Sequence, residues 1–398
     1  MNKKTTNSKA FVLIVTGLVS AFGPFVTDFY LPALPALGNY FQTTASLVQL
    51  SLTFSMVGLA VGQLIIGPLS DKYGRKLPLQ ISLCLFCLST IGCLYAESIY
   101  GFVFFRLLQG LAGAGGVVIS KSIATDLYQG RELMRFFAML SSVQGIAPIG
   151  APVLGGVLLE TTDWKGIFWV LLFIGMALLT SICFFRESLP AEKRQHAGVG
   201  SMFRHYLPVL RHGQFMRYVW IQAFAMGVMF VYIAASPFIF QEHFGMSPLT
   251  YSLCFGINAV GIMLGSLAAS RFADALTALR FGIKGFCCLS LPVAASLLVS
   301  PSVWVVEGML FLFLIFLGLI LPGSTSLALD LERDNSGNAS ALLGFLMFLF
   351  GGMLSPLTGI GNMIGTTALL IVACSIGTWA CMHDRKRTRK AVVFMTRR

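Results

Sequence analysis

The stretch Gly67-Pro68-Leu69-Ser70-Asp71-Lys72-Tyr73-Gly74-Arg75-Lys76 separates two long apolar runs of the chain. Its charged residues and its two glycines stand between segments that are apolar enough to lie in a membrane. The pattern indicates a tight polar turn that joins two transmembrane helices at one face of the membrane. Gly74 permits backbone angles that are closed to other residues, and a tight turn requires such angles.

The composition extends this interpretation to the whole chain. Of the 398 residues, 56% are hydrophobic and 11% are charged, whereas soluble domains have about 45–50% apolar and about 25% charged residues. The mean hydropathy is +0.80. A transmembrane barrel would show segments of about ten residues that alternate between apolar and polar side chains, and the sequence has none. The expected fold class is therefore an all-α integral membrane protein.

Apolar segments of about 20 residues recur with short polar breaks and predict about twelve transmembrane helices. The longest break is a predicted cytoplasmic linker at residues 187–216. It separates an N-terminal six-helix bundle, residues 1–186, from a C-terminal six-helix bundle with a basic cytoplasmic tail, residues 217–398. The predicted spans are 10–35, 46–70, 77–96, 99–124, 133–159, 166–186, 217–241, 248–273, 281–299, 303–329, 338–361 and 364–382.

The basic residues give the chain a net charge of +12, and they gather in alternate loops, as the positive-inside rule describes. Basic clusters precede the first span and occupy residues 72–76, 186–217 and 385–398. The other loops are assigned the acids Glu97, Glu160, Asp163, Glu242 and Glu307. This asymmetry predicts that both termini lie in the cytoplasm. It also makes a nucleic-acid-binding surface the poorer interpretation, so no nucleic-acid partner is expected.

The sequence predicts no metal, nucleotide or nucleophile site. The nine cysteines fall in or at the ends of apolar runs, where they serve as small packing residues. The linker residues His196, His205 and His212 have no ligand spacing and suit a solvated or headgroup-facing amphipathic segment. Gly113-Ala114-Gly115-Gly116 lacks the Gly-Lys-Ser/Thr ending of a phosphate-binding loop, so ATP-driven pumping is not expected.

Short segments in the two halves of the chain resemble each other. The segment 58–64 resembles the segment 261–267, which lies 203 positions later, and the same interval carries Asp71 onto Asp274. Ala151-Pro152-Val153-Leu154-Gly155 likewise resembles Ser355-Pro356-Leu357-Thr358-Gly359. The agreement predicts two pseudo-symmetric six-helix bundles, as found in secondary transporters.

The pattern Gly-x-Leu-x-Asp-x-x-Gly-Arg-Lys at residues 67–76 closely resembles the signature of the major facilitator superfamily. Residues 106–110 and 145–156 resemble its drug:proton antiporters. Residues 28–35 and 126–128 look most like the Bcr/CflA group, named for bicyclomycin and chloramphenicol resistance. The resemblance implies the major facilitator fold, a bacterial inner-membrane location, and efflux of small drug-like molecules driven by proton entry. It implies no cofactor other than the proton gradient.

The opening stretch and the end of the fourth helix supply a candidate cytoplasmic gate, formed by Gly67, Asp71, Gly74, Arg75 and Asp126. Asp71 and Arg75 are four positions apart and can pair along a helix end. Asp126 could complete a cluster that ties helix ends together when the cytoplasmic side is closed. In the alternative interpretation, the basic residues only set the topology. Because the second copy has Thr277 and Ala278 in place of the glycine and arginine, such a latch is expected to be asymmetric.

Asp28 and Arg106 are predicted to lie inside the hydrocarbon, where each charge costs about 2.5–3.5 kcal/mol on insertion scales. Both fall in the outer half of the membrane, on polar faces of the first and fourth helices that are expected to line a central cavity. The hypothesis is that Asp28 binds the coupling proton or a cationic substrate, and that Arg106 tunes this binding and competes for the carboxylate. The alternative is a static buried ion pair that holds the two helices together.

Further cavity residues are predicted from their positions: Gln109 and Gly113 share the helix face of Arg106, and Gln222, Tyr232 and Asn258 face inward in the second half. No central Asp or Glu is expected in the second half, so proton chemistry is assigned mainly to the first half.

The fifth predicted helix carries a segment that resembles the antiporter motif of drug exporters, with Gly145, Pro148, Gly150, Pro152, Gly155 and Gly156. Small residues allow helices to cross closely, and prolines bend the helix. On physical grounds alone, ordinary kinked packing explains the segment equally well, and the family resemblance favours export.

Three functions remain open from the sequence. The first is a proton-coupled drug exporter, which is a secondary active transporter rather than an enzyme, and the second is an uptake carrier for a nutrient or osmolyte. The third is a non-transporting receptor or scaffold, which should tolerate neutralisation of Asp28 and Arg106. The expected partners are a small-molecule substrate, protons and the lipid bilayer, and the expected oligomeric state is a monomer.

Overall fold

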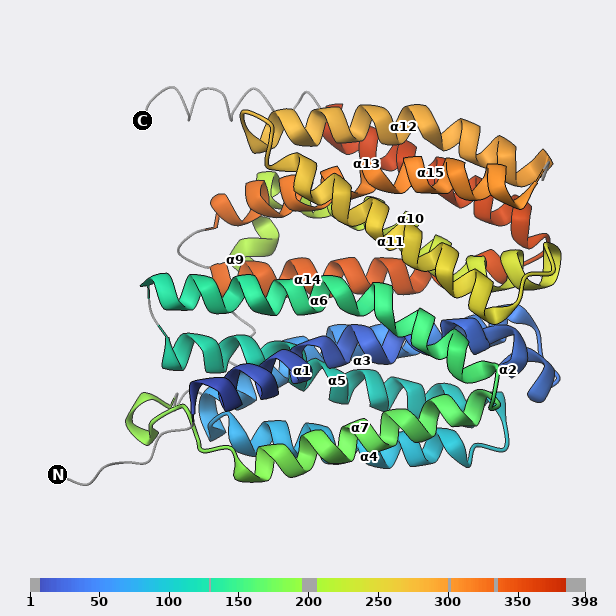
Figure 1. Ribbon diagram of the computed structural model, residues 1–398. Coiled ribbons are helices and arrows are strands. Elements are labelled where there is room, and N and C mark those ends of the chain that lie inside the picture. The colour runs from blue at the N-terminus through green and yellow to red at the C-terminus, as the bar shows by residue number, and fades with distance from the viewer. Residues whose placement is uncertain (1–7, 129, 195–205, 300–301, 333–335, 384–398) are drawn as a thin grey trace. The chain divides into compact units, whose positions relative to one another are not determined.

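The computed structural model describes residues 8–128, 130–194, 206–299, 302–332 and 336–383, and within these ranges every regular element is a helix (Figure 1). The helices of the first half are α1 (Lys9–Asp28), η1 (Leu31–Ala33), α2 (Leu34–Tyr40), α3 (Ala45–Tyr73), α4 (Lys76–Leu94), α5 (Ile99–Leu127), α6 (Gly130–Leu159) and α7 (Trp164–Phe184). Later helices are η2 (Ala191–Lys193), α9 (Tyr206–Arg211), α10 (Gly213–Phe238), η3 (Ile239–His243), α11 (Pro248–Ala269), α12 (Ala275–Val299), α13 (Val303–Asp330), α14 (Ser336–Leu354), η5 (Ser355–Gly359) and α15 (Met363–His383).

The lengths and hydropathy of these helices confirm the predicted class of all-α integral membrane protein. Within the described ranges, 10 helices are long and apolar enough to cross a membrane, or up to 11 if the bent pair Lys9–Gly23 and Phe25–Tyr40 counts as one span. The predicted span 133–159 corresponds to α6, in which Ile146–Leu159 forms a shorter apolar helix.

The first span differs from the predicted continuous helix over residues 10–35. Helix α1 ends at Asp28, and the chain continues through the short helix η1 into α2. Pro32 and Pro35 each stand in the first turn of the helix that follows, where a missing N–H costs nothing. The two prolines disfavour a longer α1, because each would remove a backbone hydrogen bond and crowd the preceding turn. Asp28 is therefore placed at a helix end.

The repeated glycines mark the same helix crossing in both halves. A methyl group on Gly62 of α3 would lie 2.7 Å from the carbonyl oxygen of Leu111 in α5. A methyl group on Gly265 of α11 would collide in the same way with the carbonyl oxygen of Ile315 in α13. The small residues that reveal the repeat in the sequence thus allow backbone to meet backbone, as expected of helices packed in a membrane.

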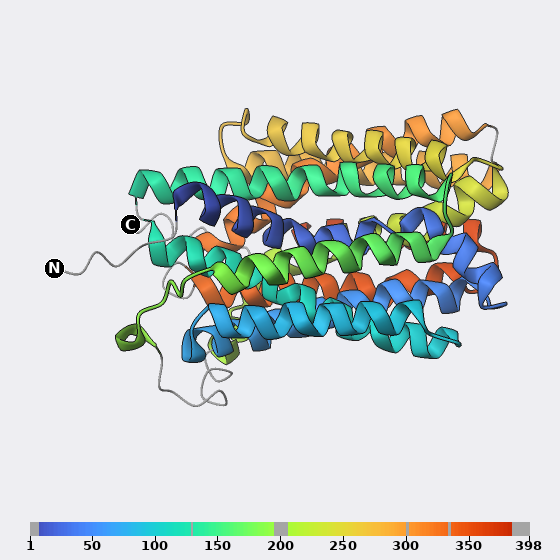
Figure 2. The same cartoon turned by 60° about the horizontal axis from the view of Figure 1, so that its bottom comes forward.

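The chain divides into two compact units: the first unit comprises Met1–Met202 and Phe240–Gly256, and the second unit comprises Phe203–Ile239 and Ile257–Arg398. Within the first unit, α5 packs along α1, α3 and α4, and α4 also packs against α7; the neighbouring positions of α4 and α7 can be followed in Figures 1 and 2. Within the second unit, α10 packs against α13, α14 and α15, and α12 packs against α13 and α15.

Candidate functional site

The turn between α3 and α4 depends on a glycine for two separate reasons. Gly74 has a φ of 91°, a conformation that side chains with a Cβ rarely adopt. A methyl group built on it would also lie 2.5 Å from Oε2 of Glu187. Gly74 therefore lets the chain reverse direction and lets a carboxylate approach the turn.

Arg75 is buried and gathers the charged groups of the candidate gate around its guanidinium. Its Nε and Nη2 donate to the two carboxylate oxygens of Asp126 at 2.8 and 3.2 Å. Its Nη1 donates to Asp71, and also to the Ser70 hydroxyl at 2.8 Å. Ser70 in turn donates to the carbonyl oxygen of Gly67 at 2.8 Å. Hydrogen bonds thus connect four of the predicted gate residues, Gly67, Asp71, Arg75 and Asp126, at the ends of α3, α4 and α5, and Gly74 precedes Arg75 in the chain.

Glu187, the first residue of the predicted linker, was not among the predicted gate residues. Its carboxylate accepts the backbone N–H groups of Arg75 and Lys76 at 2.8 and 3.1 Å, where α4 begins. An anion is favourable at a helix N-terminus because the first N–H groups have no partner within the helix. The next residue, Ser188, donates to Asp126 at 3.0 Å. The available signal was an acid directly after an apolar span, followed by Ser-Leu-Pro.

The corresponding place in the second half has a different structure. Asp274 precedes α12 and accepts both the backbone N–H and the hydroxyl of Thr277 at 2.8 Å. The backbone N–H of Thr277 holds the pKa of the Asp274 carboxyl below its usual range. Asp274 therefore acts as a local helix cap within its own segment, in keeping with the expected asymmetry.

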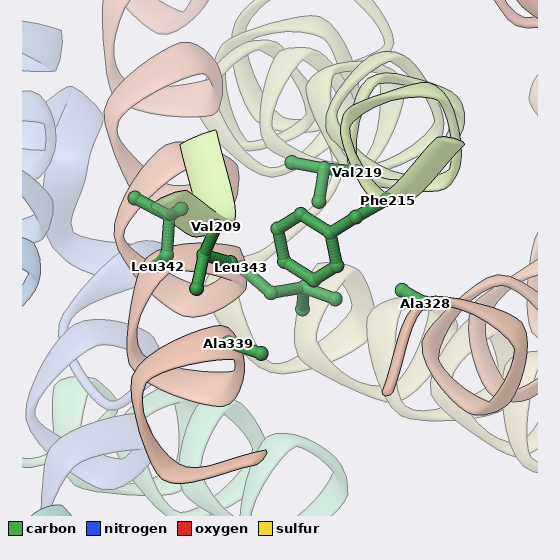
Figure 3. Packing of buried hydrophobic residues seen from close by; sticks show 7 residues of the cluster. All are labelled: Val209, Phe215, Val219, Ala328, Ala339, Leu342 and Leu343. Atoms are coloured by element: carbon green, nitrogen blue, oxygen red, sulfur yellow. The ribbon is translucent and has the colours of Figure 1, made fainter. Parts of the chain in front are cut away.

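A cluster of buried apolar side chains surrounds the beginning of α10. Val209 of α9 lies against Phe215 and Val219 of α10 and against Leu342 and Leu343 of α14 (Figure 3). This apolar contact fixes the short helix α9 on the second unit.

Charged residues flank the same cluster. His212, which was expected to face solvent or headgroups, instead forms a pair with Glu332. Arg217 donates to the carbonyl oxygens of Cys381 and Met382 at the end of α15. His196 and His205 lie outside the described residues.

Asp28 and Arg106 are both buried in the first unit, with exposed fractions of 7% and 0%. Among the described residues, neither of them forms an ion pair. The Thr27 hydroxyl donates to Oδ1 of Asp28 at 3.1 Å. The guanidinium of Arg106 lies over the ring of Tyr30 at 4.1 Å and donates weakly to the carbonyl oxygen of Val26 at 3.4 Å. The structure therefore does not contain the static ion pair of the alternative interpretation.

Arg106 continues a polar network through α5. It donates to Oε1 of Gln109, whose amide nitrogen donates to the Thr90 hydroxyl of α4 at 2.8 Å. Gly113 lies on the same helix face, where a methyl group would be 3.9 Å from Gly23 of α1. Gln109 thus connects its own helix, α5, to α4. The Nε atom of Arg106 has no hydrogen-bond partner among the described residues.

In the second unit, Asn258 is hydrogen-bonded to Tyr232 and to an acid that was predicted to lie in a loop. Asn258 Nδ2 donates to the Tyr232 hydroxyl at 2.9 Å and to Oε2 of Glu307 at 3.0 Å. Glu307 lies inside α13 with an exposed fraction of 6%. The assignment of Glu307 to a loop, and the expectation of no internal acid in the second half, were therefore wrong. Hydropathy averaged over a window hides a single acid within such an apolar helix.

Gln222 lies in α10 and is bonded to two other helices. Its Oε1 accepts the hydroxyls of Ser324 and Thr325 in α13 at 3.2 and 2.9 Å, and its Nε2 lies 3.6 Å from the sulfur of Met347 in α14. Gln222 and Asn258 are therefore in separate hydrogen-bonded groups.

The antiporter segment lies in α6, whose interior contains Pro148 and Pro152. A methyl group on Gly155 would collide with the carbonyl oxygen of Phe29, the residue after Asp28. A methyl group on Gly156 would lie 2.5 Å from Ser252, which belongs to the same unit. Gly150 has open space around it, and Gly145 lies where the surroundings are not described. The segment thus packs closely against the end of α1 that carries Asp28.

Comparison with known proteins gives a consistent family. The sequence model of the Major Facilitator Superfamily matches residues 13–356. The chain is 35% identical to the "Uncharacterized MFS-type transporter YdgK" of Bacillus subtilis (strain 168), over 96% of each chain. It is 26% identical to the "Bicyclomycin resistance protein homolog" of Haemophilus influenzae, covering 92% of this chain and 94% of the relative. A crystal structure of a D-xylose-proton symporter has a TM-score of 0.75 at 15% identity and covers 93% of this chain and 97% of its own.

Proposed function

Because the chain belongs to the major facilitator superfamily, and is therefore a multi-pass membrane transporter of small molecules rather than an enzyme, we propose that it exports drug-like compounds in exchange for protons. Distant relatives named for resistance support this proposal, among them the "Bicyclomycin resistance protein homolog" and the "Chloramphenicol resistance protein" of Pseudomonas aeruginosa, at 26% and 27% identity. The proposed location is the bacterial inner membrane with both termini in the cytoplasm.

The observation that carries the proposal is the buried Asp28 carboxyl, which has no basic partner among the described residues. An ionised group inside the hydrocarbon is costly, and protonation removes its charge. A proton on Asp28 would therefore favour a closed, dehydrated state, and release of the proton would require water or a cation. Arg106 contacts the carbonyl oxygen of Val26 and the ring of Tyr30, which lie two positions before and two positions after Asp28 in the sequence, and we propose that it competes for the carboxylate in another state of the cycle.

The contacts around Arg75 support a role as a gate on the cytoplasmic side. One guanidinium ties Asp71 at the end of α3 to Asp126 at the end of α5. The Glu187 carboxylate joins the segment after α7 to the beginning of α4 by accepting two backbone N–H groups. Charge-assisted hydrogen bonds of this kind are strong when closed and can be exchanged for water when open. The basic residues of these loops support the cytoplasmic assignment.

The packing of α6 supports a mechanical link between this helix and Asp28. Gly155 allows α6 to touch the backbone of Phe29, the residue after Asp28. A change in the bend of α6 at Pro152 would therefore move the backbone beside the proposed proton site. We propose that this contact links movement of α6 to the protonation of Asp28.

Transport in everted membrane vesicles tests the proposal, with chloramphenicol and bicyclomycin as the first probes. Vesicles that contain the wild-type protein should accumulate a transported probe when a proton gradient is imposed. Asp28→Asn should abolish this accumulation, whereas Glu97→Gln, which neutralises an exposed acid, should retain it. Accumulation in right-side-out vesicles instead would show uptake, and normal export by a well-expressed Asp28→Asn variant would exclude Asp28 as the proton carrier.

A further inference from the structure

The second unit contains a buried acid in a group of three hydrogen-bonded side chains, each from a different helix. Tyr232 comes from α10, Asn258 from α11 and Glu307 from α13. One amide nitrogen, Nδ2 of Asn258, connects the tyrosine hydroxyl at 2.9 Å with the carboxyl Oε2 at 3.0 Å. The proposed transport mechanism does not use this group.

Two oxygen atoms of this group lack a hydrogen-bond donor. Oε1 of Glu307 and Oδ1 of Asn258 are buried and have no partner among the described residues. Both atoms are acceptors when the acid is ionised. A buried acceptor without a donor is unfavourable, by about 1–3 kcal/mol in mutational data and more for a charged group. A proton bound to the carboxyl supplies one O–H donor and removes the charge at the same time.

In the described part of the chain, no cation on the helices around Glu307 would keep this acid ionised. No ion pair in the described part of the chain includes Glu307. The described helices α11 and α14 contain no Asp, Glu, Lys, Arg or His. On α10, Arg217 lies 15 positions before Tyr232, about 22 Å along the helix axis. On α12, Arg280 and Lys284 lie within the first three turns, whereas α13 begins just after the far end of α12.

The remaining titratable side chains on helices packed around α13 are neutral in their ordinary forms, as tyrosines and thiols. They are Tyr218 and Tyr232 on α10, Tyr251 and Cys254 on α11, and Cys287 and Cys288 on α12. Protonation is therefore the available way to neutralise Glu307.

The duplication shows that this acid has no counterpart in the first unit. Helices α1 and α10 begin at residues 9 and 213, and Asp28 and Tyr232 differ by the same 204 positions. Helices α5 and α13 begin at residues 99 and 303, again 204 positions apart. The first unit thus has the buried acid Asp28 on α1 and the buried arginine Arg106 on α5. The second unit has a tyrosine in place of the acid, and its acid, Glu307, on the helix equivalent to α5.

We propose that Glu307, held by Asn258 and Tyr232, is a second proton-binding carboxyl group, contained in the second unit and independent of Asp28. In this step a proton from water binds a carboxylate oxygen of Glu307, so one O–H bond forms and the charge of the group changes from −1 to 0. When the site is hydrated, the proton returns to water. Asn258 orients the carboxyl group through its amide and is a positioning residue.

Infrared spectroscopy of the purified full-length protein in nanodiscs tests this assignment without any transported compound. The C=O stretching band of protonated carboxyl groups is followed while the pH is raised. The wild-type protein should show a component that titrates, and Glu307→Gln should lose it. Glu97→Gln, the same chemical change at an exposed site, should keep it. Asp28→Asn should also keep it, because the two acids are proposed to titrate independently.

A second variant covers the case in which Glu307→Gln does not fold. Asn258→Leu keeps the carboxyl group and removes the amide that holds it, so the component should remain but should titrate at a different pH. The same component in wild type and in folded Glu307→Gln would overturn the proposal, and so would an unchanged titration in Asn258→Leu. These results are separate from the vesicle assay: failure of drug export with an intact Glu307 titration would reject only the proposed function.

Discussion

The carboxylate of Glu187 accepts the backbone N–H of Arg75 at 2.8 Å, across 112 positions of the sequence. The segment after α7 therefore closes the first turn of α4, and the residue whose amide it binds also carries the guanidinium between Asp71 and Asp126. Backbone and side chain of Arg75 are held by different partners, which fixes the guanidinium in place.

The capping role of Glu187 can be measured by hydrogen exchange. Glu187→Ala removes the acceptor of the Arg75 and Lys76 amides, and loss of such a cap costs about 0.5–2 kcal/mol. Exchange of these two amides should become about twofold to thirtyfold faster, because about 1.4 kcal/mol corresponds to a factor of ten. Glu187→Gln keeps an acceptor oxygen and should have an intermediate effect. Exchange unchanged in both variants would show that the cap does not stabilise the turn.

Gly74→Ala should lower the thermal stability of the protein. The left-handed backbone of residue 74 costs a residue with a Cβ roughly 1–2 kcal/mol, and the new methyl group would displace Glu187. Gly150→Ala is the matched control, since its position in α6 has open space and alanine favours a helix. The measurement is the melting temperature of each purified variant. Equal melting temperatures for the two variants would contradict the assigned role of Gly74.

Arg75→Lys should impair function although lysine keeps the positive charge. A lysine cannot form the two-pronged contact with Asp126 while also reaching Asp71 and Ser70. Each lost charged hydrogen bond is worth about 1.5–3 kcal/mol. Both the melting temperature and the rate of probe export should fall, whereas Lys72→Arg should leave both close to wild type. Wild-type export by Arg75→Lys would mean that positive charge alone suffices there.

The ring of Tyr30, which lies under the Arg106 guanidinium, should contribute more to stability than the Tyr30 hydroxyl does. Tyr30→Phe removes only the contact with the Ser51 hydroxyl at 3.1 Å, a loss of about 1 kcal/mol. Tyr30→Leu also removes the ring under the guanidinium, and a desolvated cation–π contact is worth about 2 kcal/mol. The leucine variant should therefore melt at a clearly lower temperature than the phenylalanine variant. The ring contact would be unimportant if both variants melted together.

Asp274 gives a pH-dependent prediction outside the membrane spans. Its pKa in the folded protein is lowered by the Thr277 N–H, so its stabilising effect is present above the unfolded pKa and is lost as the pH falls through the folded pKa. Asp274→Ala should melt below wild type near neutral pH, and the difference should shrink below about pH 4, where carboxyls protonate. A difference that stays constant across this range would exclude the charged cap as its cause.

Part of the candidate site could be read from local spacing. Asp71 and Arg75 are separated by one helical turn, and they do pair. The contact of Arg75 with Asp126 was expected from the order of the helices, because α3 and α5 end on the same side of a bundle. Glu187 and Glu307 could not be placed in this way. Each acquires its partners from helices far away in sequence, and an isolated acid beside an apolar run has no periodic signal of its own.

The sequence by itself determined the helical membrane class, the approximate spans, the duplication and the family, because hydropathy and short-range spacing carry that information. Only the tertiary structure decided which charges are buried and what they touch. Arg106 lies over Tyr30 and is bonded to Gln109, and Glu307 is bonded to Asn258. The reason is that burial and hydrogen bonding of a side chain depend on the neighbouring helices, and the position of a residue along its own helix does not specify those neighbours.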